Sequence, residues 1–157
     1  MYGAGEDVYS NRGRLYYGAQ NYDLALNDFN KAIEINPNHF KAYLNRGNIY
    51  DQFGEWDKAE ADFKKSLALN PEFSLAYTNL GNLYKEKGDF TQAVESYTKA
   101  LSLENQSAAL YYNHSLAYLG LKDYPKALKD ARQAKILGYE DLGIYIAKLE
   151  KTGSSLF

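Results

Sequence analysis

Apolar residues recur through most of this chain at spacings of three and four, with polar residues between them. Residues 40–53 show the pattern in one segment, and residues 56–69 show it again in the next. This spacing places the apolar side chains on one side of an α-helix. The pattern therefore predicts an all-α fold built from amphipathic helices of about fourteen residues each.

Short turns separate the predicted helices. Gly54-Glu55 and Gly88-Asp89 divide two helices within a pair, and an Asp at such a turn can accept the free amides of the following helix. Pro37 and Pro71 divide one pair from the next, because proline cannot continue the preceding helix. The turns therefore predict a series of antiparallel helix pairs.

The helix pairs repeat with a period of 34 residues. When the four copies are aligned in this frame, each repeated position forms a column. One column holds tyrosine, one holds small residues, one holds alanine in every copy, and one holds large apolar residues. These columns hold Tyr9, Tyr43, Tyr77 and Tyr111; Gly13, Gly47, Gly81 and Ser115; Ala25, Ala59, Ala93 and Ala127; and Phe29, Phe63 and Tyr97. The frame predicts four repeats, at residues 6–39, 40–73, 74–107 and 108–141.

This frame resembles the tetratricopeptide repeat (TPR), a helix–turn–helix unit of the same length. The fourth copy departs from the family signature, with Ala131 in place of the second-helix aromatic residue and Tyr139 in place of the terminal proline. The resemblance implies a right-handed α-solenoid, in which antiparallel helix pairs stack into a superhelix.

The terminal repeat of such an array needs a cover for its apolar side. Residues 140–151 carry apolar side chains at helical spacing and are predicted to form a C-terminal capping helix. Residues 1–5 are then an N-terminal extension, and residues 152–157 a tail.

Composition narrows the classes of partner. The net charge of −2 leaves no broad basic field for phosphates, so a nucleic-acid partner is not expected. No apolar run is long enough to span a bilayer, so membrane insertion is not expected either. Cysteine is absent, which leaves the compartment undetermined: cytoplasmic is the default, and a periplasmic protein or a trimmed secreted fragment are the alternatives.

Candidate catalytic chemistry is sparse. His39 and His114 are the only histidines, and neither takes part in zinc-ligand or triad spacing. The sequence Gly3-Ala4-Gly5 does not continue into a nucleotide-binding turn. We therefore expect a protein that is not an enzyme and has no metal or cofactor.

One pair of columns carries opposite charges together or not at all. The seventh and twenty-third positions hold Arg12 with Asp28, Arg46 with Asp62, Leu80 with Ser96, and His114 with Asp130. A buried charge is costly unless it is paired. We predict a structural ion pair between the two helices of each charged repeat, which makes His114 structural and not catalytic.

The sixth position of every repeat is asparagine, at Asn11, Asn45, Asn79 and Asn113, which we name the asparagine ladder. Asparagine is a weaker helix former than alanine, so its repetition asks for a reason. The resemblance implies that the first helices line a concave groove, where an amide can pair with both polar groups of a peptide backbone. The predicted groove also includes Asn48, Asn82, Arg14, Lys41, Lys85, Tyr112, Ser10 and Leu44.

The sequence thus predicts an adaptor that binds an extended peptide of another protein. The basic residues of the family's clamp for acidic chaperone tails are missing, since the third copy offers Leu75 and Asn79 at two of those positions. Two alternatives stay open. One is a self-assembling scaffold, in which exposed helices or the terminal Leu156-Phe157 dock onto another copy; the less favoured one is an RNA-binding helical repeat.

Overall fold

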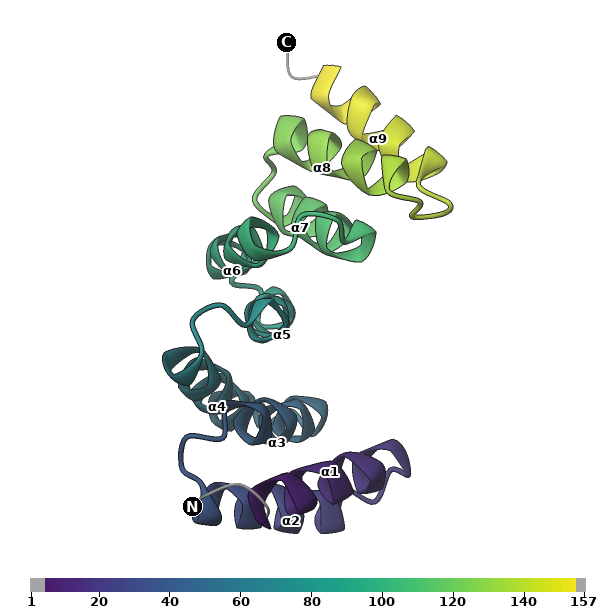
Figure 1. Ribbon diagram of the computed structural model, residues 1–157. Helices are drawn as coiled ribbons and strands as arrows, with labels where there is room; N and C mark the ends of the chain where they lie inside the picture. Colours follow the sequence, from purple (N-terminus) through teal and green to yellow (C-terminus); the bar gives the residue numbers. More distant parts are fainter. Residues whose placement is uncertain (1–4, 155–157) are drawn as a thin grey trace. The chain divides into compact units, whose positions relative to one another are not determined.

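The computed structural model describes residues 5–154. Most of the predicted N-terminal extension and the end of the predicted tail, including Leu156-Phe157, lie outside the described residues. Nine α-helices form within residues 5–154 (Figure 1). They are α1 (Gly5–Gly18), α2 (Tyr22–Ile35), α3 (Phe40–Gln52), α4 (Trp56–Leu69), α5 (Ser74–Glu86), α6 (Phe90–Leu103), α7 (Ala108–Gly120), α8 (Tyr124–Ile136) and α9 (Gly143–Ser154).

The turns within the helix pairs share one backbone feature. Each places a residue with positive φ directly before the next helix's N-cap: Gln20 (60°), Gly54 (72°), Gly88 (78°) and Lys122 (60°). After two of these turns an aspartate caps the next helix, since Asp89 accepts from the Gln92 N–H and Asp123 from the Lys126 N–H. The predicted turns are therefore the points where one helix of a pair ends and the other begins.

The chain divides into two compact units, residues 1–76 and residues 77–157, with the division inside α5. In the first unit, α1 pairs with α2, α3 pairs with α4, and α3 also packs against α2 (Figure 1). Its core includes the buried side chains of Ala25, Phe29 and Ile49. In the second unit, α7 packs against α6 and α8, and α9 covers α8.

Close packing within a pair explains the column of small residues. A Cβ added at Gly13 would lie 2.7 Å from the ring of Phe29, and one added at Gly47 would lie 2.7 Å from the ring of Phe63. Both rings are fully buried. The first helix can approach the second this closely because the glycine has no side chain in the way.

The capping helix is displaced from its predicted range. Helix α9 spans Gly143–Ser154 and so begins later than residue 140 and continues into the predicted tail. Gly138 and Asp141 both have positive φ, which places residues 138–142 in turns and delays the helix. Leu142 and Leu149 are buried, and Leu149 packs with Ala127 and Ala131 of α8.

Candidate peptide-binding surfaces

Bidentate ion pairs join the helices of the first two repeats. Arg12 donates through Nε and Nη2 to the two carboxylate oxygens of Asp28, each at 2.7 Å. Arg46 makes the same two bonds with Asp62, also at 2.7 Å. Both carboxylates are buried, and the hydrogen bonds to Asp62 raise the pKa of Arg46 although burial opposes this. These pairs orient each first helix on its second helix.

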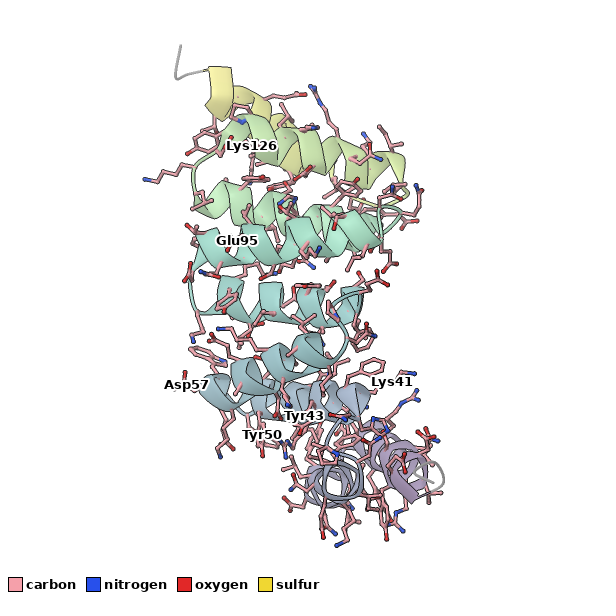
Figure 2. The ribbon with its side chains drawn as sticks, turned by 60° about the vertical axis from the view of Figure 1, so that its left-hand side comes forward. Lys41, Tyr43, Tyr50, Asp57, Glu95 and Lys126 are labelled. Atoms are coloured by element: carbon pink, nitrogen blue, oxygen red, sulfur yellow. The ribbon has the colours of Figure 1, made fainter. Side chains whose placement is uncertain are left out.

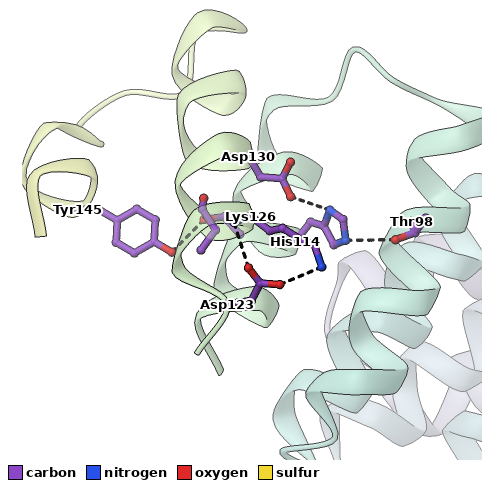
Figure 3. Close-up of polar contacts among 8 residues, drawn as sticks. Thr98, His114, Asp123, Lys126, Asp130 and Tyr145 are labelled. Atoms are coloured by element: carbon purple, nitrogen blue, oxygen red, sulfur yellow. Dashed lines mark hydrogen bonds and ion pairs between the residues drawn. The ribbon is translucent and has the colours of Figure 1, made fainter. Parts of the chain in front are cut away.

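Repeat 4 replaces the arginine with a histidine (Figure 3). His114 Nδ1 lies 2.8 Å from Asp130 Oδ2, and His114 Nε2 lies 3.2 Å from Thr98 Oγ1 on α6. The order of Asp130, His114 and Thr98 is that of a hydrolytic triad. Thr98 lies inside α6, however, where backbone N–H groups bond within the helix and cannot stabilise an oxyanion. The contacts of His114 thus link α7 to both α8 and α6.

A metal site does not emerge from the part of the chain that the structure describes. Within it, no three side chains of His, Cys, Asp or Glu are placed to hold an ion.

In the first unit, two members of the asparagine ladder lie on α1 and α3. Asn11 is exposed and Asn45 is half-buried. Neither carboxamide has a hydrogen-bond partner within residues 5–154. A half-buried amide without a partner has lost some hydration without gaining a bond in return. Among residues 5–154, the carboxamide of Asn45 therefore keeps an unsatisfied donor and acceptor.

Other predicted residues of the first unit lie in different environments. Arg14 and Lys41 are exposed, and the Lys41 ammonium lies 5.8 Å from the centre of the Phe40 ring (Figure 2 shows Lys41 near one end of α3). Asn48 is half-buried and has an interaction within the protein. Ser10 and Leu44 are buried, so the expectation that they line an open surface is wrong. Ser10 lies on α1, which also contacts α3.

In the second unit, two predicted asparagines have their oxygens engaged. Asn113 Oδ1 accepts from Lys85 Nζ at 3.0 Å, and Asn82 Oδ1 accepts from the Tyr97 hydroxyl at 2.6 Å. Burial lowers the pKa of Lys85 and raises that of Tyr97. The NH₂ groups of Asn82 and Asn113 are then left without a partner among residues 77–154. Asn79 is half-buried and has an interaction of its own.

Tyr112 belongs to an aromatic cluster at the C-terminal end of the second unit. Its ring stacks on Tyr139 with centroids 4.5 Å apart and meets Tyr145 of α9 edge-on at 5.9 Å. The sequence predicted Tyr112 in the groove because the fifth position of each repeat shares a face with the asparagine ladder by helical spacing. The structure adds that the ring also lies against the chain segment that covers repeat 4.

The tetratricopeptide repeat family matches residues 6–39, 40–73 and 74–106. The chain belongs to this family, whose members are protein-interaction modules and usually not catalytic. The match stops before repeat 4, although α7 and α8 form the same kind of helix pair. The family implies protein partners, and no described helix has the length and apolar character needed to cross a membrane.

Solved structures of low sequence identity share the fold. A structure described as MamA 41-end from Desulfovibrio magneticus RS-1 is 18% identical, with a TM-score of 0.87, over 98% of this chain and 88% of that one. One from a functional characterization of Pseudomonas aeruginosa PilF is 20% identical, with a TM-score of 0.84, over 96% of this chain and 70% of that one. Among curated proteins no sequence match was found. At these identities the likeness shows the fold alone.

Proposed function

We propose that this protein is a non-enzymatic adaptor that binds extended peptide segments of a partner protein on its first-helix faces. The asparagine ladder pairs with the N–H and C=O groups of the peptide backbone, so recognition depends little on the peptide's side chains. The observation that carries this proposal is the half-buried carboxamide of Asn45, which has no partner within residues 5–154.

The spacing of helices supports this mode of binding. Packed helices lie about 8–10 Å apart, and an extended chain rises about 3.3 Å per residue, so roughly every third peptide residue meets a new asparagine. At about 1 kcal/mol per hydrogen bond, four such contacts give roughly 4 kcal/mol, which corresponds to millimolar affinity, and a few apolar contacts bring it nearer to micromolar than nanomolar. The interaction is therefore transient.

The two units offer different hydrogen-bonding groups to a ligand. In the first unit, Asn11 and Asn45 present both a donor and an acceptor. In the second unit, Lys85 and Tyr97 occupy the oxygens of Asn113 and Asn82, which leaves mainly donors. Peptide carbonyl and carboxylate groups suit the second surface better than amide N–H groups do.

A peptide array probed with the intact protein tests the proposal. The variants are Asn45→Ala for the first unit and Asn113→Ala for the second. Asn27→Ala is the matched control, since Asn27 is an exposed asparagine on the second helix of a pair. Losing two backbone hydrogen bonds is expected to weaken bound peptides about tenfold, whereas the control leaves the pattern of binding unchanged. An array pattern that both test variants leave intact would overturn the proposal.

A further inference from the structure

A pocket opens in the first unit between the turn that joins α1 to α2 and the end of α3. Its volume is about 490 Å³, within the range of roughly 300–1,000 Å³ that ligand sites have. We name it the turn pocket. The residues that line it are Ala19, Gln20, Asn21, Tyr22, Asp23 and Phe53. Two aromatic rings and one carboxylate therefore share one pocket.

The two rings of the turn pocket meet at a right angle. The ring of Tyr22, the first residue of α2, lies 5.3 Å from that of Phe53, with 88° between their planes. Phe53 is 58% exposed, so part of its ring is open to a ligand. The Tyr22 hydroxyl accepts from Gln52 Nε2 at 2.7 Å. The rings thus offer aromatic surface, and an aromatic face attracts a cation.

The carboxylate of the turn pocket has no cation beside it. Asp23 is exposed and has neither an ion pair nor a hydrogen bond of its carboxylate among residues 5–154. Within the same residues, no Lys or Arg lies over the ring of Tyr22 or Phe53. The N-terminus of α2 adds about half a positive elementary charge here, and the full charge of the carboxylate outweighs it. The pocket therefore has a net negative charge and lacks a positive group.

The same kinds of group already hold arginines inside this protein. The Arg46 guanidinium carbon lies 5.5 Å and 5.9 Å from the centres of the Tyr43 and Tyr50 rings, both labelled in Figure 2, while Asp62 accepts its two hydrogen bonds. Arg12 is held in the same way in repeat 1. A planar guanidinium can lie on rings and donate to a carboxylate at the same time. Two rings with one aspartate thus form an arginine site twice in the first unit.

We propose that the turn pocket binds an arginine side chain of a partner protein. The guanidinium stacks on the exposed part of the Phe53 ring and donates to the Asp23 carboxylate. The side-chain oxygens of Gln20 and Asn21 are further acceptors at the rim. The pocket shares no residue with the asparagine ladder, so this inference is separate from the proposed peptide binding.

The second unit does not repeat this combination of groups. The positions equivalent to Tyr22, Asp23 and Phe53 hold Phe90, Thr91 and Leu121 there. They provide one ring and no carboxylate. The arginine site is therefore a property of the first unit and not of the repeated fold.

Nuclear magnetic resonance titration of the intact protein with N-acetylarginine methylamide tests the site. The signals of residues 20–23 and of Phe53 should shift at millimolar concentrations of the probe, because a ring contact and an exposed ion pair are each worth about 1 kcal/mol or less. The citrulline analogue has nearly the same shape without the charge and should bind clearly more weakly. Absence of shifts at these residues, or equal binding of the two probes, would overturn the proposal.

Variants of the pocket separate the ring from the carboxylate. Phe53→Leu keeps an apolar side chain without a ring, and Asp23→Asn keeps the shape without the charge; each should weaken the arginine probe about threefold. Asp141→Asn is the matched control, since Asp141 is an exposed aspartate in another turn, and it should bind as wild type does. Circular dichroism verifies that the variants are folded. Titrations that both pocket variants leave unchanged would also overturn the proposal. Peptide-array binding of Asp23→Asn should match wild type, which distinguishes failure of this pocket from failure of the asparagine ladder.

Discussion

Repeats 2 and 4 pack the same helix pair with different side chains. In repeat 2, the ring of Phe63 fills the space beside Gly47, and Arg46 makes two bonds to Asp62. In repeat 4 the small residue is Ser115, the large ring is replaced by Ala131, and the arginine is replaced by a histidine. The exchange of Gly47 for Ser115 therefore accompanies that of Phe63 for Ala131, whereas the histidine still faces an aspartate, Asp130.

The space left by Ala131 is filled from outside the repeat. Leu149 of α9 packs with Ala127 and Ala131, and the Tyr145 hydroxyl lies 2.9 Å from Ser115 Oγ, which also donates to the Ala127 carbonyl. Figure 3 shows Tyr145 approaching from α9. In repeat 2 the ring beside the small residue comes from the repeat's own second helix, whereas in repeat 4 the contact comes from the helix that follows it. The comparison shows that the small residue of the first helix and the residue it faces on the second helix change together.

The largest loss of stability is expected from substitutions that disrupt the ring packing of repeat 2. Phe63→Ala should destabilise the protein by about 4 kcal/mol, because it removes a fully buried ring and leaves a cavity. Gly47→Ser should also destabilise it, since the new side chain meets that ring. Urea unfolding measures both changes. If the columns are coupled, the double variant should be more stable than the sum of the single effects predicts; strict additivity would contradict the pairing.

An intermediate effect is expected from the ion pair. Arg46→Ala leaves the buried Asp62 carboxylate without its partner and should cost about 3 kcal/mol in the free energy of unfolding. Arg12→Ala is the comparison, because the Arg12 side chain is half-exposed and water replaces it more easily. The loss at Arg12 should be clearly smaller in the same urea titration. Equal losses would show that burial does not set the strength of these pairs.

The smallest loss of stability is expected from removing the hydroxyl contact between α9 and repeat 4. Tyr145→Phe removes the hydroxyl beside Ser115 and should lower stability by about 1 kcal/mol. Tyr139→Phe is the control, since the described residues show a ring contact for Tyr139 and no hydrogen bond of its hydroxyl. Thermal unfolding should separate the two variants. A Tyr145→Phe protein as stable as the control would mean that α9 covers repeat 4 by apolar packing alone.

Much of the paired packing was readable from the sequence. The four copies align within one chain, so the joint appearance of Arg46 with Asp62, and its absence at Leu80 and Ser96, predicts a contact across each pair. Comparison of the four copies could not predict the contacts of Tyr112. Tyr139 and Tyr145 occur once, near or beyond the end of the last repeat, where no other copy provides a comparison.

The sequence by itself determined the helices, their turns and the residues that face each other within a repeat. These features follow from a 34-residue pattern that occurs four times in the chain. Only the tertiary structure decided which repeated positions keep a free polar group. Lys85 reaches Asn113, while Asn45, at the same position of repeat 2, has no such neighbour within residues 5–154. Identical positions differ in this way because the state of a side chain depends on the helix packed beside it, and that helix is not the same in every repeat.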